Sequence, residues 1–309
     1  MATCVVATAA TACGDLSKEQ SNSKQKRAPI SSKLEHFVSM APSNTELIYA
    51  IGAQDQLIGV CKQCDFPADA KSKTVFGDFT HANLEKLATI QPDAVLLVDG
   101  QEPMKATIEK QSAFRPRVVT IHNLAIRDVA SNVRSLGILT GHSKRAFAVA
   151  DEFENDWQTV ERITRMTPNK PKVFFCVWPE PLMTIGNSSY LNDAITVCGG
   201  TNIAASLNGA YPRFSVEKLV MEDPDVIIMP DEADHSLATK APWSKLKAVT
   251  NKHLYFLPPR KDDRLSRPTI RVLEGLFWLA ERLHPEFKEK LSMSKNSISH
   301  LLTTTSPKP

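Results

Sequence analysis

The sequence contains no long apolar run and almost no excess of charge. None of its apolar stretches approaches the roughly 18–20 residues that a membrane-spanning helix requires. Its 37 lysines and arginines are nearly balanced by 34 aspartates and glutamates, which leaves a net charge of +3. The basic residues are scattered, and no nucleic-acid-reading motif is present. We therefore predict neither a transmembrane helix nor a nucleic-acid partner.

The common catalytic motifs are also missing. The chain has no Gly-x-Ser-x-Gly, no Walker loop and no Gly-x-Gly-x-x-Gly. Its eight histidines include no His-x-x-x-His pair, and none is spaced from a second ligand as a zinc site requires. His81 could ligate a metal, but a solvent-facing loop histidine is the simpler interpretation. We predict a protein that is not an enzyme, with no resident metal and no cofactor.

The six cysteines divide into two groups. Cys4 and Cys13 lie in the N-terminal leader, and the other four lie in the main body of the chain. Cys61 and Cys64 have the Cys-x-x-Cys spacing of redox proteins, but the Asp-Phe-Pro that follows would break the helix that lowers a thiolate pKa. Redox chemistry, a disulfide or two unreactive thiols are all compatible with this pattern.

The N-terminus resembles an export signal with a lipid attachment site. Residues 1–12 are small and apolar, and they end in Ala-Thr-Ala-Cys, with Cys13 as the residue that would be acylated. The segment departs from a lipoprotein signal in lacking a basic start and in having Ala10 where leucine is usual, so an unstructured terminus is the other interpretation. Residues 14–36 are polar and predict a solvated tether. Together they predict an exported protein in the periplasm or at the outer face of the cytoplasmic membrane.

One segment of the chain occurs twice. Residues 84–98 and 216–229 share Glu-Lys-Leu and, further on, Pro-Asp, all at one offset of 132 positions. A single repeat at this distance indicates a duplicated domain, because solenoid repeats have periods of about 20–50 residues. The length of 309 residues also fits two domains. We therefore predict two similar lobes.

Each lobe should be an α/β unit with a parallel sheet, because β-branched runs alternate with helical segments. We expect strands over 36–40, 57–60, 94–98, 117–121, 172–177 and 254–257. Ser43 and Glu46 predict a capping box at a helix start, and Ser143 is expected to cap a long helix over 144–166 whose aromatic residues belong to the core. The predicted organisation is a leader and tether over 1–36, an N-terminal α/β lobe over 37–142, a connecting helix over 143–167, a C-terminal α/β lobe over 168–290 and a frayed tail over 291–309.

Aromatic residues lie in the loops where ligands of α/β proteins usually bind. Phe79 and Tyr211 occupy the same position of the repeat, and Phe66 and Trp178 lie in proline-containing loops. Since ligands bind outside the carboxyl ends of parallel strands and between domains, matched aromatics suggest a bulky planar ligand held from both sides. Any one of these rings could instead pack onto its own lobe.

Two glutamates are also matched between the lobes. Glu85 and Glu217 each follow a helix N-cap, Asn83 and Ser215 respectively, by two residues. A carboxylate in the first turn is favoured by the helix dipole, by about 0.3–1 kcal/mol. Their symmetry equally suits docking on the arginines of a two-fold symmetric partner. The spacing alone leaves both interpretations open.

Several motifs together resemble one family. These are Ala-Pro-Ser-Asn-Thr-Glu-Leu over 41–47, the Cys-Asp-Phe-Pro loop, Asn-Leu-Glu over 83–85, Val-Cys-Gly-Gly-Thr-Asn-Ile over 197–203 and Ser-x-Glu-Lys-Leu over 215–219. They are similar to the helical-backbone periplasmic binding proteins of ABC importers, and most similar to the cobalamin-binding members. The resemblance extends over about residues 37–287. It implies two Rossmann-like lobes with parallel sheets joined by one long α-helix.

The resemblance also implies a function. The protein would be a monomer that captures cobalamin or a related corrinoid in an inter-lobe cleft and delivers it to an ABC transporter permease dimer. The first alternative is the same role for haem or a ferric siderophore, which the same fold carries. The remote alternative is an exported redox protein that uses Cys61 and Cys64. By resemblance, Glu85 and Glu217 dock on permease arginines, and the ligand contacts are Phe66, Phe79, Trp178, Tyr211, Asp263 and Arg267.

This chain departs from the cobalamin-binding members at three places. Phe79 and Tyr211 stand where tryptophan is often found. Asp99 and Gly100 stand where an aromatic residue can occur. Cys198 matches a family disulfide cysteine without the usual partner, so Cys176 or no partner remains open.

Overall fold

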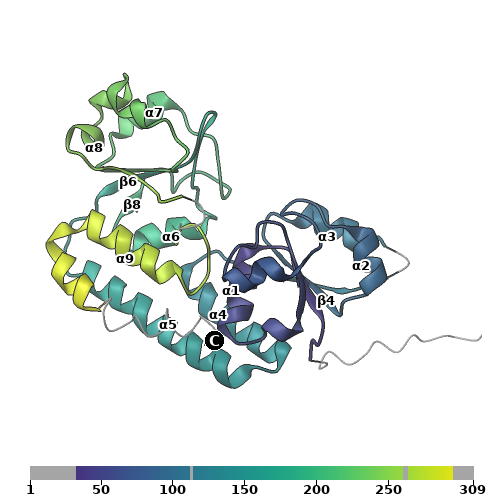
Figure 1. Ribbon diagram of the computed structural model, residues 1–309. Coiled ribbons are helices and arrows are strands. Elements are labelled where there is room, and N and C mark those ends of the chain that lie inside the picture. The colour runs from purple at the N-terminus through teal and green to yellow at the C-terminus, as the bar shows by residue number, and fades with distance from the viewer. Residues whose placement is uncertain (1–32, 112–113, 260–263, 295–309) are drawn as a thin grey trace, which may run out of the picture. The chain divides into compact units, whose positions relative to one another are not determined.

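The computed structural model describes residues 33–111, 114–259 and 264–294. The first lobe contains a five-stranded sheet in the order β3-β2-β1-β4-β5, and every pair of neighbouring strands is parallel. Its elements are β1 (Phe37–Ser39), α1 (Pro42–Ala50), β2 (Leu57–Val60), β3 (Thr74–Val75), α2 (Leu84–Ile90), β4 (Ala94–Val98), α3 (Glu102–Glu109) and β5 (Arg117–Ile121) (Figure 1). The α/β prediction with a parallel sheet is confirmed for this lobe.

The second lobe has a mixed sheet. Strands β10, β9, β6 and β8 pair in parallel, whereas β7 runs antiparallel to β6. A tight turn joins β6 to β7, and such a turn can connect only antiparallel strands. The elements are β6 (Lys172–Pro179), β7 (Leu182–Thr184), α6 (Tyr190–Val197), β8 (Thr201–Asn202), α7 (Val216–Glu222), β9 (Val226–Met229), α8 (Lys247–Thr250) and β10 (Leu254–Phe256).

Three further helices are α4 (Ile126–Thr140), α5 (Ser143–Thr164) and α9 (Val272–Leu283), and residues 288–294 are also helical. Helix α5 contacts α4, α6 and α9. Short 3₁₀ turns occur at Gln54–Gln56, Ala68–Ser72, His235–Thr239, Trp243–Lys245 and Pro285–Phe287. The long helix predicted over 144–166 is therefore present as α5.

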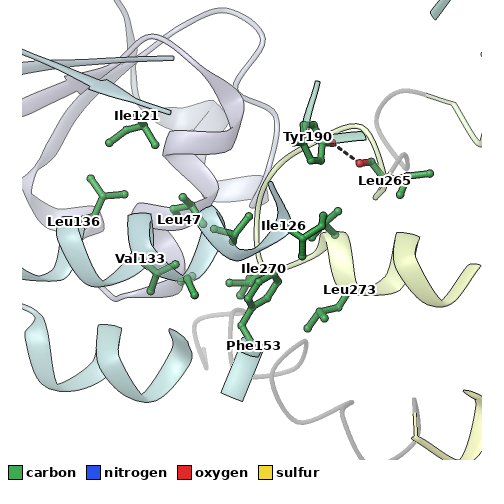
Figure 2. Close-up of a cluster of buried hydrophobic side chains, with 14 of the residues drawn as sticks. Leu47, Ile121, Ile126, Val133, Leu136, Phe153, Tyr190, Leu265, Ile270 and Leu273 are labelled. Atoms are coloured by element: carbon green, nitrogen blue, oxygen red, sulfur yellow. Dashed lines mark hydrogen bonds between the residues drawn. The ribbon is translucent and has the colours of Figure 1, made fainter. Parts of the chain in front are cut away.

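One apolar core runs through the first sheet and these helices. It includes Leu47 of α1, Ile126 of α4, Phe153 of α5 and Leu273 of α9, all fully buried (Figure 2). The hydroxyl of Tyr190 donates a hydrogen bond to the carbonyl of Leu265 in the same region. A second, smaller core covers the other face of the β6 sheet, where it is formed by Phe174, Cys176, Leu219, Ile227, Met229 and Trp243 among others.

The repeated segment folds in the same way in both lobes. Asn83 and Ser215 are the N-caps of α2 and α7, and each side chain accepts a hydrogen bond from the backbone N–H three residues later. Both helices end at a residue in the left-handed region, Gln91 with φ 51° and Asp223 with φ 42°. The side chains that the helices bury, Leu87 and Leu219, also correspond.

The Pro-Asp of the repeat joins neighbouring strands. Asp93 Oδ2 accepts hydrogen bonds of 2.8 Å from the backbone N–H groups of Glu35 and His36, immediately before β1. Asp225 Oδ2 accepts one of 2.8 Å from the N–H of Lys172, at the start of β6. Each aspartate therefore ties the strand after its helix to the strand that opens its lobe. Carboxylate–amide bonds of this kind explain why the dipeptide occurs twice.

The predicted capping box is wrong. Helix α1 begins two residues earlier than the capping box predicts, with Ala41 in place of Ser43 as N-cap, Pro42 as the first helical residue and no side-chain cap. Proline at the first helical position is pre-organised for a helix start, so Ser43 already lies inside the helix. Glu46 is 4% exposed and forms an ion pair with Arg271 instead of folding back on the helix start.

The prediction of Ser143 as a helix cap is also wrong. Ser143 is the first residue of α5, the N-cap is His142, and no side chain caps the helix. The Ser143 hydroxyl instead donates to the carbonyl of Gly137 at 3.5 Å. Of the aromatic residues assigned to the core, Phe153 is fully buried, but Phe147 is 43% exposed.

The predicted bounds of the tether and of the tail both include residues that belong to the folded chain. Leu34 is buried in the core, and its N–H donates to the carbonyl of Leu139, so the lobe begins before residue 37. Residues 291–294 are helical, and Leu291 is fully buried, so the tail does not begin at 291. In both places one leucine inside a polar stretch is enough to anchor the chain.

Candidate functional site

The first-lobe loops that follow β1, β3 and β4 are tied together by Gln101. This side chain is 3% exposed, and its Nε2 donates to the carbonyls of Met40 (2.9 Å) and Phe79 (2.7 Å). Its Oε1 accepts from the N–H of Val98 at 3.0 Å. All polar groups of the buried amide therefore have partners. Gln101 is not among the predicted site residues, because a glutamine three residues after a buried strand is a weak signal of function.

Phe79 is held by its backbone and presents its ring to solvent. Its N–H donates to Oε1 of Gln63 (3.0 Å), and its carbonyl accepts from Gln101. The side chain is 38% exposed. The loop needs Gly77, which has φ 141° and lies so close to the carbonyl of His81 that an added Cβ would be 2.1 Å away.

In the second lobe, a segment beside β7 carries Tyr211. The N–H groups of Thr184 and Gly186 donate to the carbonyls of Pro212 and Ala210, each at 3.0 Å. These bonds fix the backbone on both sides of Tyr211, whose side chain is 50% exposed. Burial raises the pKa of the Tyr211 hydroxyl, with Ser189 opposing the shift, so the hydroxyl end of this side chain lies against its own lobe while half of the side chain stays exposed.

Trp178 lies near the end of β6 and is 43% exposed. Its indole N–H donates to the carbonyl of Glu180 at 2.6 Å, which fixes the ring orientation. In the described part of the chain, the aromatic side chains classed as exposed are Phe79, Phe147, Trp178 and Tyr211. Three of these four are predicted ligand contacts.

Phe66 and Arg267 are engaged in a different way. The guanidinium carbon of Arg271 lies 3.6 Å from the centroid of the Phe66 ring, so a cation already covers this ring. Arg267 Nη1 donates to Glu46 (2.9 Å) and to Asp65 (2.6 Å). Asp263, the remaining predicted contact, lies outside the described residues.

The ion pairs of Arg267 join residues that are far apart in sequence. Glu46 belongs to α1, and Asp65 belongs to the loop after β2. Burial raises the pKa of Glu46, while hydrogen bonds from Arg267 and Thr269 oppose that shift. Arg267 therefore forms ion pairs with α1 and with the loop after β2, and a ligand that contacts Arg267 would also contact Asp65.

Cys61 and Cys64 are free thiols in this structure, as are Cys176 and Cys198. The two sulfur atoms of the first pair lie 3.0 Å apart, and both residues are buried. The hydrogen bond between the two thiols lowers the pKa of Cys64 and raises that of Cys61. Cys198 donates to the carbonyl of Leu276 at 3.3 Å. Of the two alternatives left open for Cys198, Cys176 or no partner, the structure has no partner, and the described cysteines form no disulfide.

Glu85 and Glu217 occupy equivalent places on the first turns of α2 and α7. Both side chains are exposed, and the neighbouring leucines Leu87 and Leu219 are buried on the opposite side. No salt bridge engages either carboxylate within the described residues. Both groups are therefore available to a partner.

His81 and His122 are exposed histidines in the first-lobe loops that follow β3 and β5. His81 Nδ1 lies 2.8 Å from Oγ1 of Thr80 and 3.6 Å from Asp78, and its side chain is 85% exposed. Among the described residues, no group of three or more histidine, cysteine, aspartate or glutamate side chains could hold a metal ion. His81 is thus placed in a solvent-facing loop.

Comparison with known proteins assigns the chain to a class. Residues 38–261 match the periplasmic binding protein family, and the chain therefore belongs to that family. Its fold is that of the helical-backbone substrate-binding proteins of ABC transporters, with two α/β lobes. In the part of the chain that the structure describes, no helix combines the length and apolar character needed to cross a bilayer.

The chain is similar to several named members of this class. The vitamin B12-binding protein of Vibrio parahaemolyticus is 26% identical over 249 residues, which cover 80% of this chain and 89% of the relative. An uncharacterized ABC transporter substrate-binding lipoprotein of Bacillus subtilis, YvrC, is 29% identical over 260 residues, covering 82% and 81%. The crystal structure of the periplasmic vitamin B12 binding protein BtuF of Vibrio cholerae has a TM-score of 0.71 and 25% identity, covering 81% of this chain and 96% of that one.

Proposed function

We propose that this protein captures a corrinoid between aromatic side chains of its two lobes and delivers it to an ABC transporter permease. The observation that carries the proposal is the pair Phe79 and Tyr211, which occupy one repeat position and are 38% and 50% exposed. Exposed rings on fixed backbones suit a large planar ligand, because they lose little conformational entropy on binding. The vitamin B12-binding relatives support the choice of a corrinoid.

The binding proposal is tested by titrating the purified chain with cyanocobalamin in a calorimeter. Phe79→Ala and Tyr211→Ala should each weaken binding about 10-fold or more, since loss of one stacked aromatic removes about 1.4 kcal/mol or more. Phe147→Ala is the matched control, because this ring is also exposed but lies on α5. Equal losses in all three variants would contradict the site. Absence of cyanocobalamin binding, with tight binding of haemin or a ferric siderophore, would overturn the corrinoid assignment.

We propose that Glu85 and Glu217 register the loaded protein on the two-fold symmetric permease. Matched carboxylates that are exposed, and that form no ion pair within the described residues, suit docking on the cationic side chains of a two-fold symmetric partner. The double variant Glu85→Ala/Glu217→Ala should keep its cyanocobalamin affinity and lose uptake through the reconstituted importer. Glu102→Ala, also an exposed glutamate in a helix first turn, is the control. Loss of ligand affinity in the double variant, or normal uptake, would refute the docking role.

We further propose that the protein acts as a monomer at the outer face of the cytoplasmic membrane, anchored by a lipid on Cys13. This residue lies outside the described part of the chain, and the lipoprotein named among the relatives supports the idea. Radiolabelled palmitate should be incorporated into the wild-type chain and not into Cys13→Ser. Cys4→Ser is the matched control, and incorporation that survives Cys13→Ser would refute the assignment.

A further inference from the structure

An ordered histidine–carboxylate pair lies where two neighbouring strands end. Strands β4 and β5 are adjacent and parallel, and Asp99 and His122 are the first residues after them. Nδ1 of His122 lies 2.5 Å from Oδ1 of Asp99. The second carboxylate oxygen accepts from the N–H of Asn123 at 3.0 Å, which holds the carboxylate in place.

The backbone around His122 is fixed by a second polar group. Nδ2 of Asn132, on α4, donates to the carbonyl of His122 (2.9 Å) and to Oδ1 of Asn123 (3.0 Å). The ring is therefore anchored through Nδ1 and through its own carbonyl.

Nε2, the second ring nitrogen of His122, can act as a metal ligand. An ionised carboxylate only accepts hydrogen bonds, so Nδ1 donates to Asp99, and in the neutral imidazole with this tautomer the lone pair is on Nε2. Within the described residues Nε2 has no hydrogen-bond partner, and the side chain is 68% exposed. A carboxylate bound to one imidazole nitrogen orients the ring and strengthens the other nitrogen as a metal ligand.

This pair adjoins the proposed ligand site. Asp99 is separated by two positions from Gln101, whose amide holds the loop that carries Phe79. Both Asp99 and Phe79 therefore follow carboxyl ends of strands in one parallel sheet. This is the edge at which open α/β sheets bind their ligands.

We propose that Nε2 of His122 coordinates the central metal of the transported macrocycle, with Asp99 as a positioning residue. The inference rests on the proposed function and adds a ligand class, namely a metallated tetrapyrrole with an exchangeable axial position. In the binding step the imidazole lone pair replaces one axial water, which leaves for bulk solvent. The metal keeps its oxidation state, and no proton is transferred.

Diaquocobinamide is the decisive probe, because both axial positions of its cobalt(III) carry water. Binding to the wild-type chain should shift the visible absorption bands of the corrin as nitrogen replaces water. Cyanocobalamin, whose axial positions are filled, should bind without such a shift. His122→Gln should abolish the shift with diaquocobinamide. Asp99→Asn should weaken diaquocobinamide binding about 10-fold or more, because loss of the orienting carboxylate lowers metal affinity by about 10–100-fold.

His81→Gln is the matched control, since His81 is also exposed and also hydrogen-bonded through Nδ1. It should leave the spectral shift intact, and loss of the shift in this variant alone would overturn the assignment to His122. Tight binding of both corrinoids without any shift would refute the inference but not the proposed function. Failure to bind either corrinoid would refute the corrinoid function. Haemin then serves as the second probe, and a Soret band that does not change in His122→Gln would refute coordination as well.

Discussion

Asp156 on the long helix α5 should destabilise the protein at neutral pH. Its Oδ2 is buried and has no hydrogen-bond partner within the described structure. Burial raises the pKa of this carboxyl from its usual 3.8 to about 6, and the nearby charge of Glu152 adds to the effect. Replacing it in Asp156→Asn removes the charge and retains the size of the side chain.

The size and sign of the effect follow from the pKa. A carboxyl whose pKa is higher in the folded state binds its proton more tightly when folded, so its contribution to stability is full below about pH 3.8 and falls until about pH 6. Each tenfold change in proton affinity is worth about 1.36 kcal/mol, which gives about 3 kcal/mol for the complete shift. Partial solvent access reduces this figure to about 2 kcal/mol. Asp156→Asn should therefore be about 2 kcal/mol more stable than the wild type at pH 8.

Urea unfolding at two pH values tests this prediction. The gain should be about 2 kcal/mol at pH 8 and about one third of that at pH 4.5, where the folded protein keeps the carboxyl protonated. Asp151→Asn is the matched control on the same helix, because Asp151 lies 2.6 Å from Arg134 in an exposed ion pair. That variant should be neutral or slightly destabilised, by about 0–1 kcal/mol. A destabilised Asp156→Asn, or a gain that does not depend on pH, would refute the reasoning.

Two further predictions concern the backbone that carries the site. Gly186→Ala should lower the free energy of unfolding by about 1–3 kcal/mol and weaken ligand binding. The reason is that a Cβ there would lie 2.3 Å from the carbonyl of Gly209, in the loop that carries Tyr211. Wild-type stability in urea unfolding and wild-type affinity in the ligand titration would contradict this close approach. Asp93→Ala and Asp225→Ala should each cost about 1–3 kcal/mol in urea unfolding, because both carboxylates accept backbone hydrogen bonds. Costs that differ by more than about 2 kcal/mol would mean that the repeated aspartates do not have equivalent roles.

The repeat shows why part of this structure could be predicted. Caps such as Asn83 and Ser215 act on backbone groups three residues away, so their effect is written in the local sequence. Strands β2, β4 and β5 have the predicted bounds, because short, largely aliphatic runs between turns are typical of buried parallel strands. The prediction of a capping box at Ser43 and Glu46 is wrong, although the motif is local. Pro42 started the helix earlier, and Glu46 had a more distant partner.

Among the site residues, the exposed aromatics were predictable and their supports were not. Phe79 and Tyr211 could be paired from the repeat offset, because duplication preserves register. Gln101 could not be recognised, since an isolated glutamine has no periodicity and its role depends on carbonyls from two distant loops. Arg267 was predicted as a ligand contact, and its use in joining Glu46 to Asp65 was not foreseen.

The sequence by itself determined the two-lobe α/β architecture, the long helix between the lobes and the two symmetric glutamates, because periodicity, capping and an internal repeat are properties of short segments or of one constant offset. Only the tertiary structure decided which side chains meet. Arg267 and Glu46 are 221 positions apart, and Asp99 and His122 are 23 apart on neighbouring strands. Such pairs depend on strand order and on how the helices pack, and no local pattern in the chain encodes either one.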